Sequence, residues 1–354
     1  MPSSTGLTLP DTCPAALGGD TNRRMSQNPL RIGVLGAAKI TPMALVRPAR
    51  EVPEVVVAAV AARDAARAEA FARRHGVAKV HKSYADLLAD DAIDAIYNPL
   101  PNGLHAEWSI RALEAGKHVL CEKPIASNAD EAAQMAAAAE RTGRVLTEAF
   151  HWRYHPPAAR MREVVQTELG EIRHVEATLC FPLPFPNDIR YSWELGGGAM
   201  MDTGCYTVNM VRWLAGAEPE VVSAEAKLAR PRVDRYMRAE LRFPGGHSGR
   251  LTSALFSARL LAIQARVEGS GGEMRVLNPL APHFFHSLKI VRPGRTTRER
   301  VRGDATYTLQ LRAFAEHVRG GKPMSSDARD GIANMRVIDA IYRAAGLTPR
   351  GSAA

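Results

Sequence analysis

Between residues 30 and 150 the chain alternates short apolar runs with stretches of helical periodicity, and this alternation constrains the fold more than any other feature. Continuous apolar runs are typical of strands covered on both faces, as in a parallel sheet. Strands are predicted at 30–35, 55–61, 93–98, 118–123 and 145–150. Helices of about 10 to 15 residues separate them, which predicts an α/β fold with a doubly wound parallel sheet, a Rossmann fold.

Polar residues mark where several of these helices begin. Thr41 before Pro42 predicts a helix N-cap followed by a first helical residue. Asp64 is expected to cap the helix after the second strand. Ser127 with Asp130 resembles a capping box for the helix that runs to residue 141.

After residue 150 the pattern changes to successive strand-like runs, which predicts a second domain of the α+β class with an open, largely antiparallel sheet. Its strands are predicted at 172–181, 221–228, 236–243, 249–256, 261–267 and 288–291, and its helices at 158–169, 307–319 and 330–345. We therefore expect domains at 29–151 and 152–346, with tails at 1–28 and 347–354.

Composition agrees with two globular domains, because 354 residues exceed the usual size of one hydrophobic core. The longest apolar run spans residues 55–62, far short of the roughly 20 residues of a membrane helix, so no membrane partner is expected. Residues 1–28 are rich in Pro, Gly, Ser, Thr and Asn, without the apolar core of an export signal. This segment is either a disordered tail or an artefact of the start site, with Met25 as the natural beginning.

The net charge of +9 would favour anionic partners, but the basic residues are scattered. One dense basic segment, 292–302, lacks the interleaved aromatic residues that stack on bases, so it is interpreted as a solvated turn or a charged edge strand, not a nucleic-acid site. The four cysteines show no spacing of a disulfide framework or a metal site, which predicts a reducing, cytoplasmic setting. They are Cys13, Cys121, Cys180 and Cys205.

The turn after the first predicted strand has the order strand, tight turn, helix that a dinucleotide site requires, and its backbone N–H groups would receive a pyrophosphate. Its residues are Gly36, Ala37, Ala38, Lys39 and Ile40. The glycine fingerprint is degraded, so this turn alone is weak support.

The second predicted strand ends at Arg63, with Arg67 one helical turn further on. Cations at this position suit the extra phosphate of NADP, whereas an acidic residue would suit NAD. The residues therefore favour NADP over NAD, unless both arginines are ordinary surface charges.

Lys123 follows a buried strand directly, and Pro124 cannot continue the sheet hydrogen bonds. In open parallel sheets ligands bind beyond the carboxyl ends of the strands, so Lys123 is expected to point at the cleft. Taken alone, Glu122-Lys123-Pro124 is better explained by an ordinary solvated lysine at a strand end. Further along, Asp202 and Tyr206 lie four residues apart after three glycines, which places a carboxylate and a phenol on one helical face.

Together these segments resemble the family of glucose-fructose oxidoreductase, inositol dehydrogenase and rhizopine catabolism proteins (Gfo/Idh/MocA), over residues 30–346. The motifs that carry the resemblance are the turn at Gly36, Asn98-Pro99 with Asn102 and His105, Glu122-Lys123-Pro124, and the segment 196–206. Within the family the chain is most similar to the dihydrodiol dehydrogenases and NADP-linked aldose dehydrogenases, on Ala62-Arg63-Asp64 and Tyr206.

The resemblance implies a dinucleotide domain followed by a sheet that covers the nicotinamide and serves as a dimer interface, in a homodimer or a dimer of dimers. It implies oxidation of a secondary alcohol of a sugar, cyclitol or dihydrodiol, or the reverse reduction. Inositol dehydrogenases carry a histidine four residues after the aspartate, where this chain has Tyr206. A catalytically silent dinucleotide-binding sensor or scaffold of the same fold is the alternative, and a nucleic-acid-binding protein is a third.

The hypothesis for the chemistry is that Lys123 polarises the substrate oxygen, Tyr206 relays the proton and Asp202 positions one of them. Burial and the nicotinamide charge are expected to lower the pKa of Lys123. The other residues expected near the cofactor are Asn98, Pro99, Asn102, His105 and Glu122, and those expected near the substrate are Arg153, Asp188 and Arg190. No metal site is predicted, because no histidine pair is completed by further ligands at ligand spacing.

Overall fold

The structure, a computed structural model, describes residues 28–351. Cys13, Met25 and nearly all of the predicted tail over residues 1–28 lie outside the described residues. No helix of the described part is long and apolar enough to cross a membrane.

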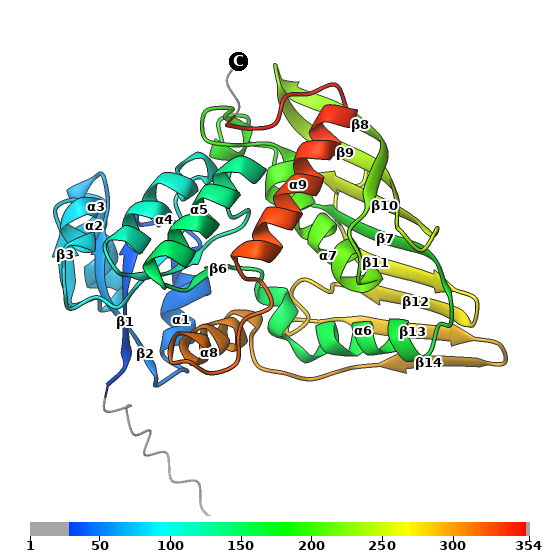
Figure 1. Cartoon of the computed structure of the whole chain (residues 1–354), viewed down its shortest axis with the longest axis horizontal. Helices are drawn as coiled ribbons and strands as arrows, with labels where there is room; N and C mark the ends of the chain where they lie inside the picture. Colours follow the sequence, from blue (N-terminus) through cyan, green and yellow to red (C-terminus); the bar gives the residue numbers. More distant parts are fainter. Residues whose placement is uncertain (1–27, 352–354) are drawn as a thin grey trace, which may run out of the picture.

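A parallel sheet of six strands forms the first half of the molecule, at the left of Figure 1. In spatial order its strands are β3 (Lys79–His81), β2 (Val55–Ala61), β1 (Leu30–Leu35), β4 (Ala95–Asn98), β5 (His118–Cys121) and β6 (Leu146–Glu148). The order reverses between β1 and β4, and ligands bind beyond the carboxyl ends of the strands at such a point. The predicted doubly wound sheet is confirmed.

Helices cover both faces of this sheet because its strands are apolar on both sides. One face packs on the π-helical turn η1 (Pro42–Val46) with α1 (Arg47–Ala49), on α2 (Ala65–His75) and on α8 (Thr306–Val318). The other face packs on α3 (Tyr84–Leu88), α4 (His105–Glu114) and α5 (Ala129–Thr142). Helix α8 comes from far along the chain, yet its Leu311 and Phe314 share a core with Ile32 and Val34.

One of the predicted helix caps was wrong, and another is confirmed in position only. Thr41 precedes Pro42, the first residue of η1, as predicted, but its backbone is helical (φ −52°, ψ −42°) and its side chain makes no cap hydrogen bond. Helix α5 is capped by Asn128 instead of Ser127, since the Asn128 side chain accepts a hydrogen bond from the backbone N–H of Glu131 at 2.9 Å. The cap at Asp64 is confirmed.

The second half is built on a sheet of eight strands, drawn at the right of Figure 1. In spatial order they are β14 (Arg295–Glu299), β13 (Ser287–Arg292), β12 (Gly272–Leu277), β11 (Ala262–Gly269), β7 (Ile172–Cys180), β10 (Ser248–Ala254), β9 (Val233–Arg242) and β8 (Glu220–Arg230). Only β7 and β10 pair in parallel, so the predicted largely antiparallel sheet is confirmed. The basic segment forms the edge strand β14, one of the two predicted alternatives.

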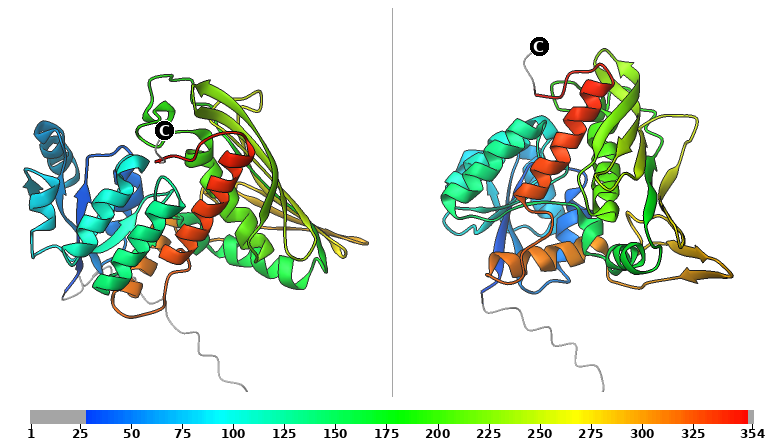
Figure 2. Two further views of the ribbon diagram at one scale, coloured as in Figure 1. Left: turned by 45° about the horizontal axis from the view of Figure 1, so that its top comes forward. Right: turned by 45° about the vertical axis from the view of Figure 1, so that its right-hand side comes forward.

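Helices α6 (Pro156–Thr167), α7 (Cys205–Ala215) and α9 (Ala328–Ala344) pack on one face of this sheet. No helix of residues 28–351 covers the opposite face (Figure 2). Helix α9 also packs against α5, so it joins the two halves. Strands β3 and β12 and helix α3 were not predicted; β3 and α3 have only 3 and 5 residues, too few for a periodic pattern.

Arg350, within the predicted C-terminal tail over residues 347–354, packs against the second half of the molecule. Arg350 is fully buried, and its guanidinium donates to Asp234 Oδ1 at 2.9 Å and to the carbonyl oxygen of Gly197 at 2.7 Å. The same guanidinium stacks on Trp193, with Arg350 Cζ 4.5 Å from the centroid of the indole ring. The chain end is therefore anchored behind the glycine segment that precedes Asp202. The domain boundaries at 29–151 and 152–346 stay predictions.

Candidate active site

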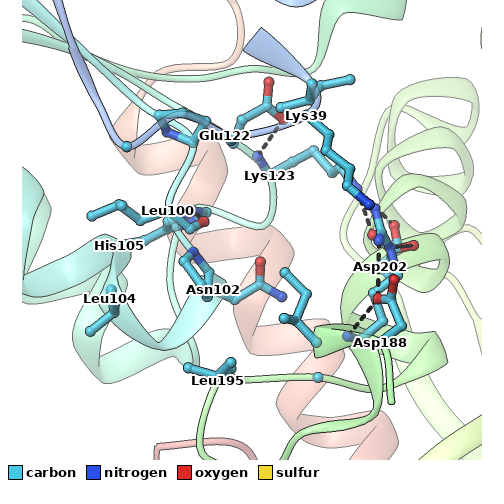
Figure 3. A pocket seen from close by; sticks show the side chains of 18 of the residues that line it. Lys39, Leu100, Asn102, Leu104, His105, Glu122, Lys123, Asp188, Leu195 and Asp202 are labelled. Atoms are coloured by element: carbon cyan, nitrogen blue, oxygen red, sulfur yellow. Dashed lines mark hydrogen bonds and ion pairs between the residues drawn. The ribbon is translucent and has the colours of Figure 1, made fainter. Parts of the chain in front are cut away.

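A cavity of about 1060 Å³ lies between the two halves, beyond the carboxyl ends of the parallel strands (Figure 3). It runs from the turn after β1 to the start of α7, so both halves supply its walls. Most residues predicted for the site line it: Gly36, Ala37, Ala38, Lys39, Ile40, Arg63, Arg67, Pro99, Asn102, His105, Glu122, Lys123, Asp188, Arg190, Asp202 and Tyr206.

At one end of the cavity the chain makes a tight turn at Gly36. Its backbone is left-handed (φ +80°), a conformation that favours glycine, and its N–H donates to the carbonyl oxygen of Ala61 at 2.6 Å. A side chain at residue 36 would also lie 3.1 Å from Leu100 Cδ2. The turn therefore brings bare backbone to the cavity wall, as the approach of a pyrophosphate requires.

Arg63 and Arg67 line the same end of the cavity. The Arg67 guanidinium donates to the carbonyl oxygen of Ala37 at 3.3 Å, which holds this cation beside the turn. Asp64 is engaged as the cap of α2, since its side chain accepts from the Arg67 backbone N–H. Two cations beside the Gly36 turn, next to a carboxylate that caps a helix, fit a ligand that carries a phosphate at this end of the cavity.

The loop after β4 contributes Asn102 and His105 to the cavity, but not Asn98. Asn98 is fully buried, and its amide donates to Ser109 Oγ at 3.0 Å, so it shapes the loop from behind instead of facing a cofactor. Asn102 donates to the Gly196 carbonyl oxygen at 2.9 Å and so ties the loop to the second half of the molecule.

His105 contacts the backbone of Pro124, the residue that follows Lys123. Its ring nitrogens lie 2.8 Å from the carbonyl oxygen of Pro124 and 2.7 Å from that of Leu100. Burial lowers the pKa of His105 to about 4, although both contacts oppose the shift. The ring therefore joins the loops after β4 and β5.

Glu122 lies beside Lys123 and is buried. One of its oxygens accepts a hydrogen bond from the Tyr97 hydroxyl at 2.7 Å, and the other accepts from the Lys123 backbone N–H at 3.3 Å. Burial raises the pKa of Glu122.

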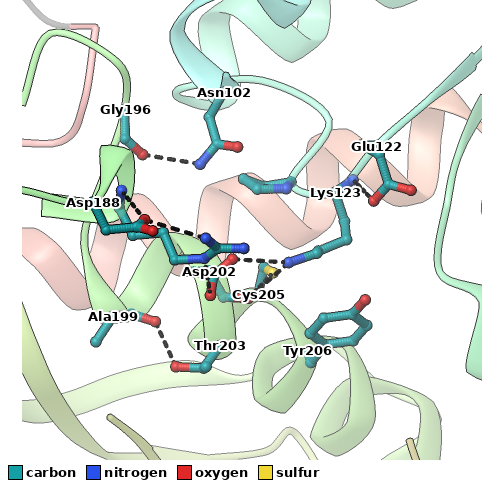
Figure 4. Close-up of polar contacts among 12 residues, drawn as sticks. Asn102, Glu122, Lys123, Asp188, Gly196, Ala199, Asp202, Thr203, Cys205 and Tyr206 are labelled. Carbon is teal, nitrogen blue, oxygen red and sulfur yellow. Dashed lines mark hydrogen bonds and ion pairs between the residues drawn. The ribbon is translucent and has the colours of Figure 1, made fainter. Parts of the chain in front are cut away.

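The ammonium of Lys123 crosses the cavity to the second half of the molecule (Figure 4). Its Nζ donates to Asp202 Oδ1 at 3.1 Å and to the Asp202 carbonyl oxygen at 3.0 Å. Burial by itself would lower the pKa of Lys123, but the Asp202 carboxylate raises it above the ordinary lysine value. The predicted lowering was wrong for this state of the protein, because the sequence did not show that the two charges touch.

Asp202 lies in the short helix η5 (Met200–Gly204) and serves two cations. Its second oxygen accepts from Arg190 Nε at 3.0 Å, and Arg190 also donates to Asp188 Oδ1 at 3.2 Å. Burial would raise the pKa of Asp202, but Lys123 and Arg190 lower it below the ordinary value. Asp202 is therefore an ionised carboxylate that positions Lys123.

Tyr206 lies one helical turn after Asp202 and faces the same lysine. Lys123 Nζ lies 4.8 Å from the centroid of the Tyr206 ring, so the structure brings the predicted ammonium and phenol together. Burial raises the pKa of Tyr206 well above the ordinary value, and the charge of Glu122 adds to the shift. The phenol is therefore protonated.

Arg153, which was predicted near the substrate, does not line the cavity. Its buried guanidinium pairs with Asp330 and stacks on Trp213, 4.3 Å from the ring centroid. The sequence shows a cation at the junction of the halves but not the carboxylate 177 residues away that engages it.

Sequence reasoning missed an apolar wall and one aromatic residue of the cavity. The wall is formed by Leu179, Phe181, Ile263 and Leu280, and Tyr307 lines the cavity near Tyr206. Leu179 and Ile263 are partners across β7 and β11, at the strand ends next to the cavity. An apolar residue at a strand end carries no signal of its own, because the same pattern extends through the core.

Among the described residues, no three His, Cys, Asp or Glu side chains form a group that could hold a metal ion.

Comparison with known proteins places this site among oxidoreductases. Residues 30–150 match the GFO_IDH_MocA model, described as an oxidoreductase family with an NAD-binding Rossmann fold, and residues 158–275 match its C-terminal domain. The chain is 37% identical over 320 residues to D-xylose 1-dehydrogenase (NADP(+)) 2 of Haloferax volcanii, covering 89% of this chain and 97% of that protein.

Two solved structures are similar over nearly their whole length. A 3-ketoreductase from Actinomadura kijaniata in complex with NADP and TDP-benzene superposes with a TM-score of 0.84 at 31% identity, over 90% of this chain and 98% of that one. An aldose-aldose oxidoreductase from Caulobacter crescentus, complexed with glycerol, gives 0.83 at 25% identity over the same shares.

Proposed function

The chain belongs to the GFO/IDH/MocA oxidoreductase family, and on that premise we propose that it is an NADP-dependent enzyme acting on a sugar, cyclitol or dihydrodiol. It transfers a hydride between the nicotinamide and the carbon of a secondary alcohol or its carbonyl. The observation that carries this proposal is the meeting of Lys123, Asp202 and Tyr206 in one cavity with the Gly36 turn.

NADP is supported by the charge at the end of β2. Arg63 and Arg67 offer two cations beside the Gly36 turn, and one carboxylate oxygen of Asp64 is engaged as the cap of α2. The relative from Haloferax volcanii is named for NADP(+), and the 3-ketoreductase was solved with NADP. When bound, the nicotinamide supplies the acceptor or donor of the hydride.

The chain's own residues orient the reacting oxygen and move its proton. The Lys123 ammonium donates a hydrogen bond to the substrate oxygen and stabilises negative charge that develops there during oxidation. Tyr206 moves the proton, because its phenol lies against Lys123 in the same cavity. During reduction the phenol gives its proton to the substrate oxygen and leaves a phenolate, which regains a proton from water; during oxidation the phenolate accepts the alcohol proton. Asp202 keeps Lys123 charged and directs it.

The lining of the cavity includes both polar and apolar side chains that could contact a substrate. Arg190, Asp188 and Asn102 offer hydrogen bonds to hydroxyl groups, and the wall of Leu179, Phe181, Ile263 and Leu280 covers a hydrocarbon face. This combination supports a small polyhydroxylated substrate with one apolar surface.

Spectrophotometric assay of pentoses, hexoses, inositols and dihydrodiols with NADP and NAD tests the proposal. We expect turnover of at least one class with NADP, and Lys123→Met is expected to lower kcat by a factor of about 10² to 10⁴ while the NADP Kd stays within about threefold. A protein that binds NADP but turns over none of these substrates would instead be the silent sensor or scaffold.

We also propose a cytoplasmic homodimer or dimer of dimers that associates through the open face of the eight-stranded sheet. Val222, Leu228 and Leu277 are large apolar side chains on its strands that are 52%, 44% and 49% exposed. Cys121, Cys180 and Cys205 are free thiols, in keeping with a reducing compartment. Light scattering on the purified protein tests this association, and the mass of a monomer would refute it.

A further inference from the structure

His151 is the polar group in contact with the hydroxyl of Tyr206. It begins the short helix η3 (His151–Tyr154) at the junction of the two halves and is only 4% exposed. Its Nε2 lies 3.3 Å from the Tyr206 hydroxyl, and its Nδ1 lies 2.8 Å from the hydroxyl of Thr306. The ring also packs against Tyr307, with 4.1 Å between the centroids. His151 is thus held on both sides, with one nitrogen toward the phenol.

The direction of the phenol proton matters because a hydroxyl has a single proton. If the Tyr206 proton points away from the cavity, an oxygen lone pair faces the substrate and can accept a hydrogen bond from an alcohol. If it points into the cavity, it can be donated to a carbonyl oxygen. Lys123 contacts the ring face of Tyr206, so the ammonium does not set this direction.

His151 is a neutral imidazole in this setting. Burial lowers the pKa of His151 to about 3, and the charges of Lys123 and His283 add to the shift. The titratable groups that face it are Lys123 after β5, Tyr206 of α7, Tyr307 of α8 and His283 of the loop after β12. A ring that stays neutral across the working pH range carries one N–H and one lone pair, and either nitrogen can hold the proton.

We propose that His151 is a positioning residue for Tyr206, which fixes the phenol hydroxyl and sets the direction of its proton; this rests on the proposed function. With the proton on Nδ1, His151 donates to Thr306 and accepts a hydrogen bond from the phenol at Nε2, which leaves a phenol lone pair facing the hydroxyl of an alcohol substrate. With the proton on Nε2, His151 donates to the phenol oxygen, which prepares Tyr206 for carbonyl reduction. The Thr306 hydroxyl serves both states because it can accept or donate.

A double-mutant cycle with Tyr206→Phe tests this role. His151→Leu is expected to lower kcat about tenfold in the wild-type background, with the KM for NADP unchanged, and less than about twofold in the Tyr206→Phe background. His151→Gln should restore most of the rate, since its side-chain amide can also accept from or donate to the phenol. An equal loss in both backgrounds, or no loss in either, would overturn the proposal.

His155 provides a matched control, because it follows on the same segment and is 1% exposed, but its ring faces His283 at 6.4 Å and not Tyr206. His155→Leu should not show the dependence on Tyr206. If His151→Leu does not fold, Thr306→Val removes the other hydrogen bond of the ring in an isosteric way. That variant should also lower kcat only while Tyr206 is present, and an equal fall with and without the phenol counts against the proposal.

A measurement on the free protein separates this proposal from the enzymatic one. NMR spectra of protein with ¹⁵N-labelled histidine report the protonation of each imidazole. The signal that is missing in His151→Gln belongs to His151, and we expect this ring to stay neutral from pH 5 to 9. Tyr206→Phe should shift its Nε2 resonance, and an unchanged resonance would overturn the contact. If the wild-type protein turns over no substrate, the proposed function fails while the spectra still decide the role of His151.

Discussion

Replacing Asp202 with asparagine tests whether this carboxylate keeps Lys123 charged. The two charged groups lie 3.1 Å apart, and their side chains are only 15% and 14% exposed. At an effective dielectric constant of about 20, unit charges at this distance attract each other by about 5 kcal/mol. That energy corresponds to a difference of about 4 pKa units for the lysine, before relaxation of the surroundings reduces it.

The sign of the effect follows from the two opposing influences on Lys123. In the wild type the Asp202 carboxylate raises the pKa of Lys123 above the ordinary value of 10.5, so the ammonium stays charged at every working pH. In Asp202→Asn the attraction is lost and burial remains, so the pKa of Lys123 falls below its ordinary value. The charge then disappears as the pH rises through the new pKa, and with it the stabilisation of negative charge on the substrate oxygen.

The profile of kcat/KM between pH 6 and 10 measures this change. Asp202→Asn is expected to show an alkaline limb that the wild type lacks. Asp188→Asn is the matched variant, since Asp188 pairs with Arg190 at 3.2 Å but not with Lys123, and its profile should have no such limb. An Asp202→Asn enzyme whose kcat/KM stays flat to pH 10 would refute the electrostatic role of Asp202.

Two further predictions concern the cofactor and the chain end. Arg63→Ala is expected to raise the KM for NADP by a factor of about 10 to 100 while the KM for NAD changes little, because only NADP carries the extra phosphate. Arg74→Ala, at the other end of α2, should change neither KM. An equal rise in the KM for both cofactors would contradict the role of Arg63 in binding the extra phosphate. Arg350→Ala is expected to lower the free energy of unfolding by about 3 to 5 kcal/mol in urea denaturation, because Asp234 would stay buried without its cation. Arg343→Ala replaces an exposed arginine on α9 and serves as the control. If Arg350→Ala lowers the free energy of unfolding by less than about 1 kcal/mol, the buried pair of Arg350 and Asp234 contributes little to stability.

Much of the fold could be predicted because it depends on local periodicity. The parallel strands of the first half were predicted from continuous apolar runs, with the exception of β3, whose 3 residues are partly exposed. The strands of the second half were predicted from their succession without helices. The cap at Ser127 was wrong because the neighbouring Asn128 competes for the same cap, and the backbone path decides which side chain accepts.

The candidate site was predicted in part, because strand ends and glycine turns have local signals. Arg63 at the end of β2 and Lys123 after β5 are examples, and both line the cavity. Arg153 was misplaced, since a cation at a domain junction can turn to the substrate or to a buried carboxylate. The contact of His151 with Tyr206 spans 55 residues of sequence and has no local signal.

The sequence by itself therefore determined the two sheets, their order along the chain and the strand end at which Lys123 stands, because side-chain periodicity reports which faces of an element are buried. Only the tertiary structure decided the state of that lysine. Its partner Asp202 lies 79 residues away, and the 3.1 Å contact between them reverses the shift in pKa that burial alone would cause. Charge interactions depend on distance in space, and distance in space between remote segments is set by the packing of the two halves.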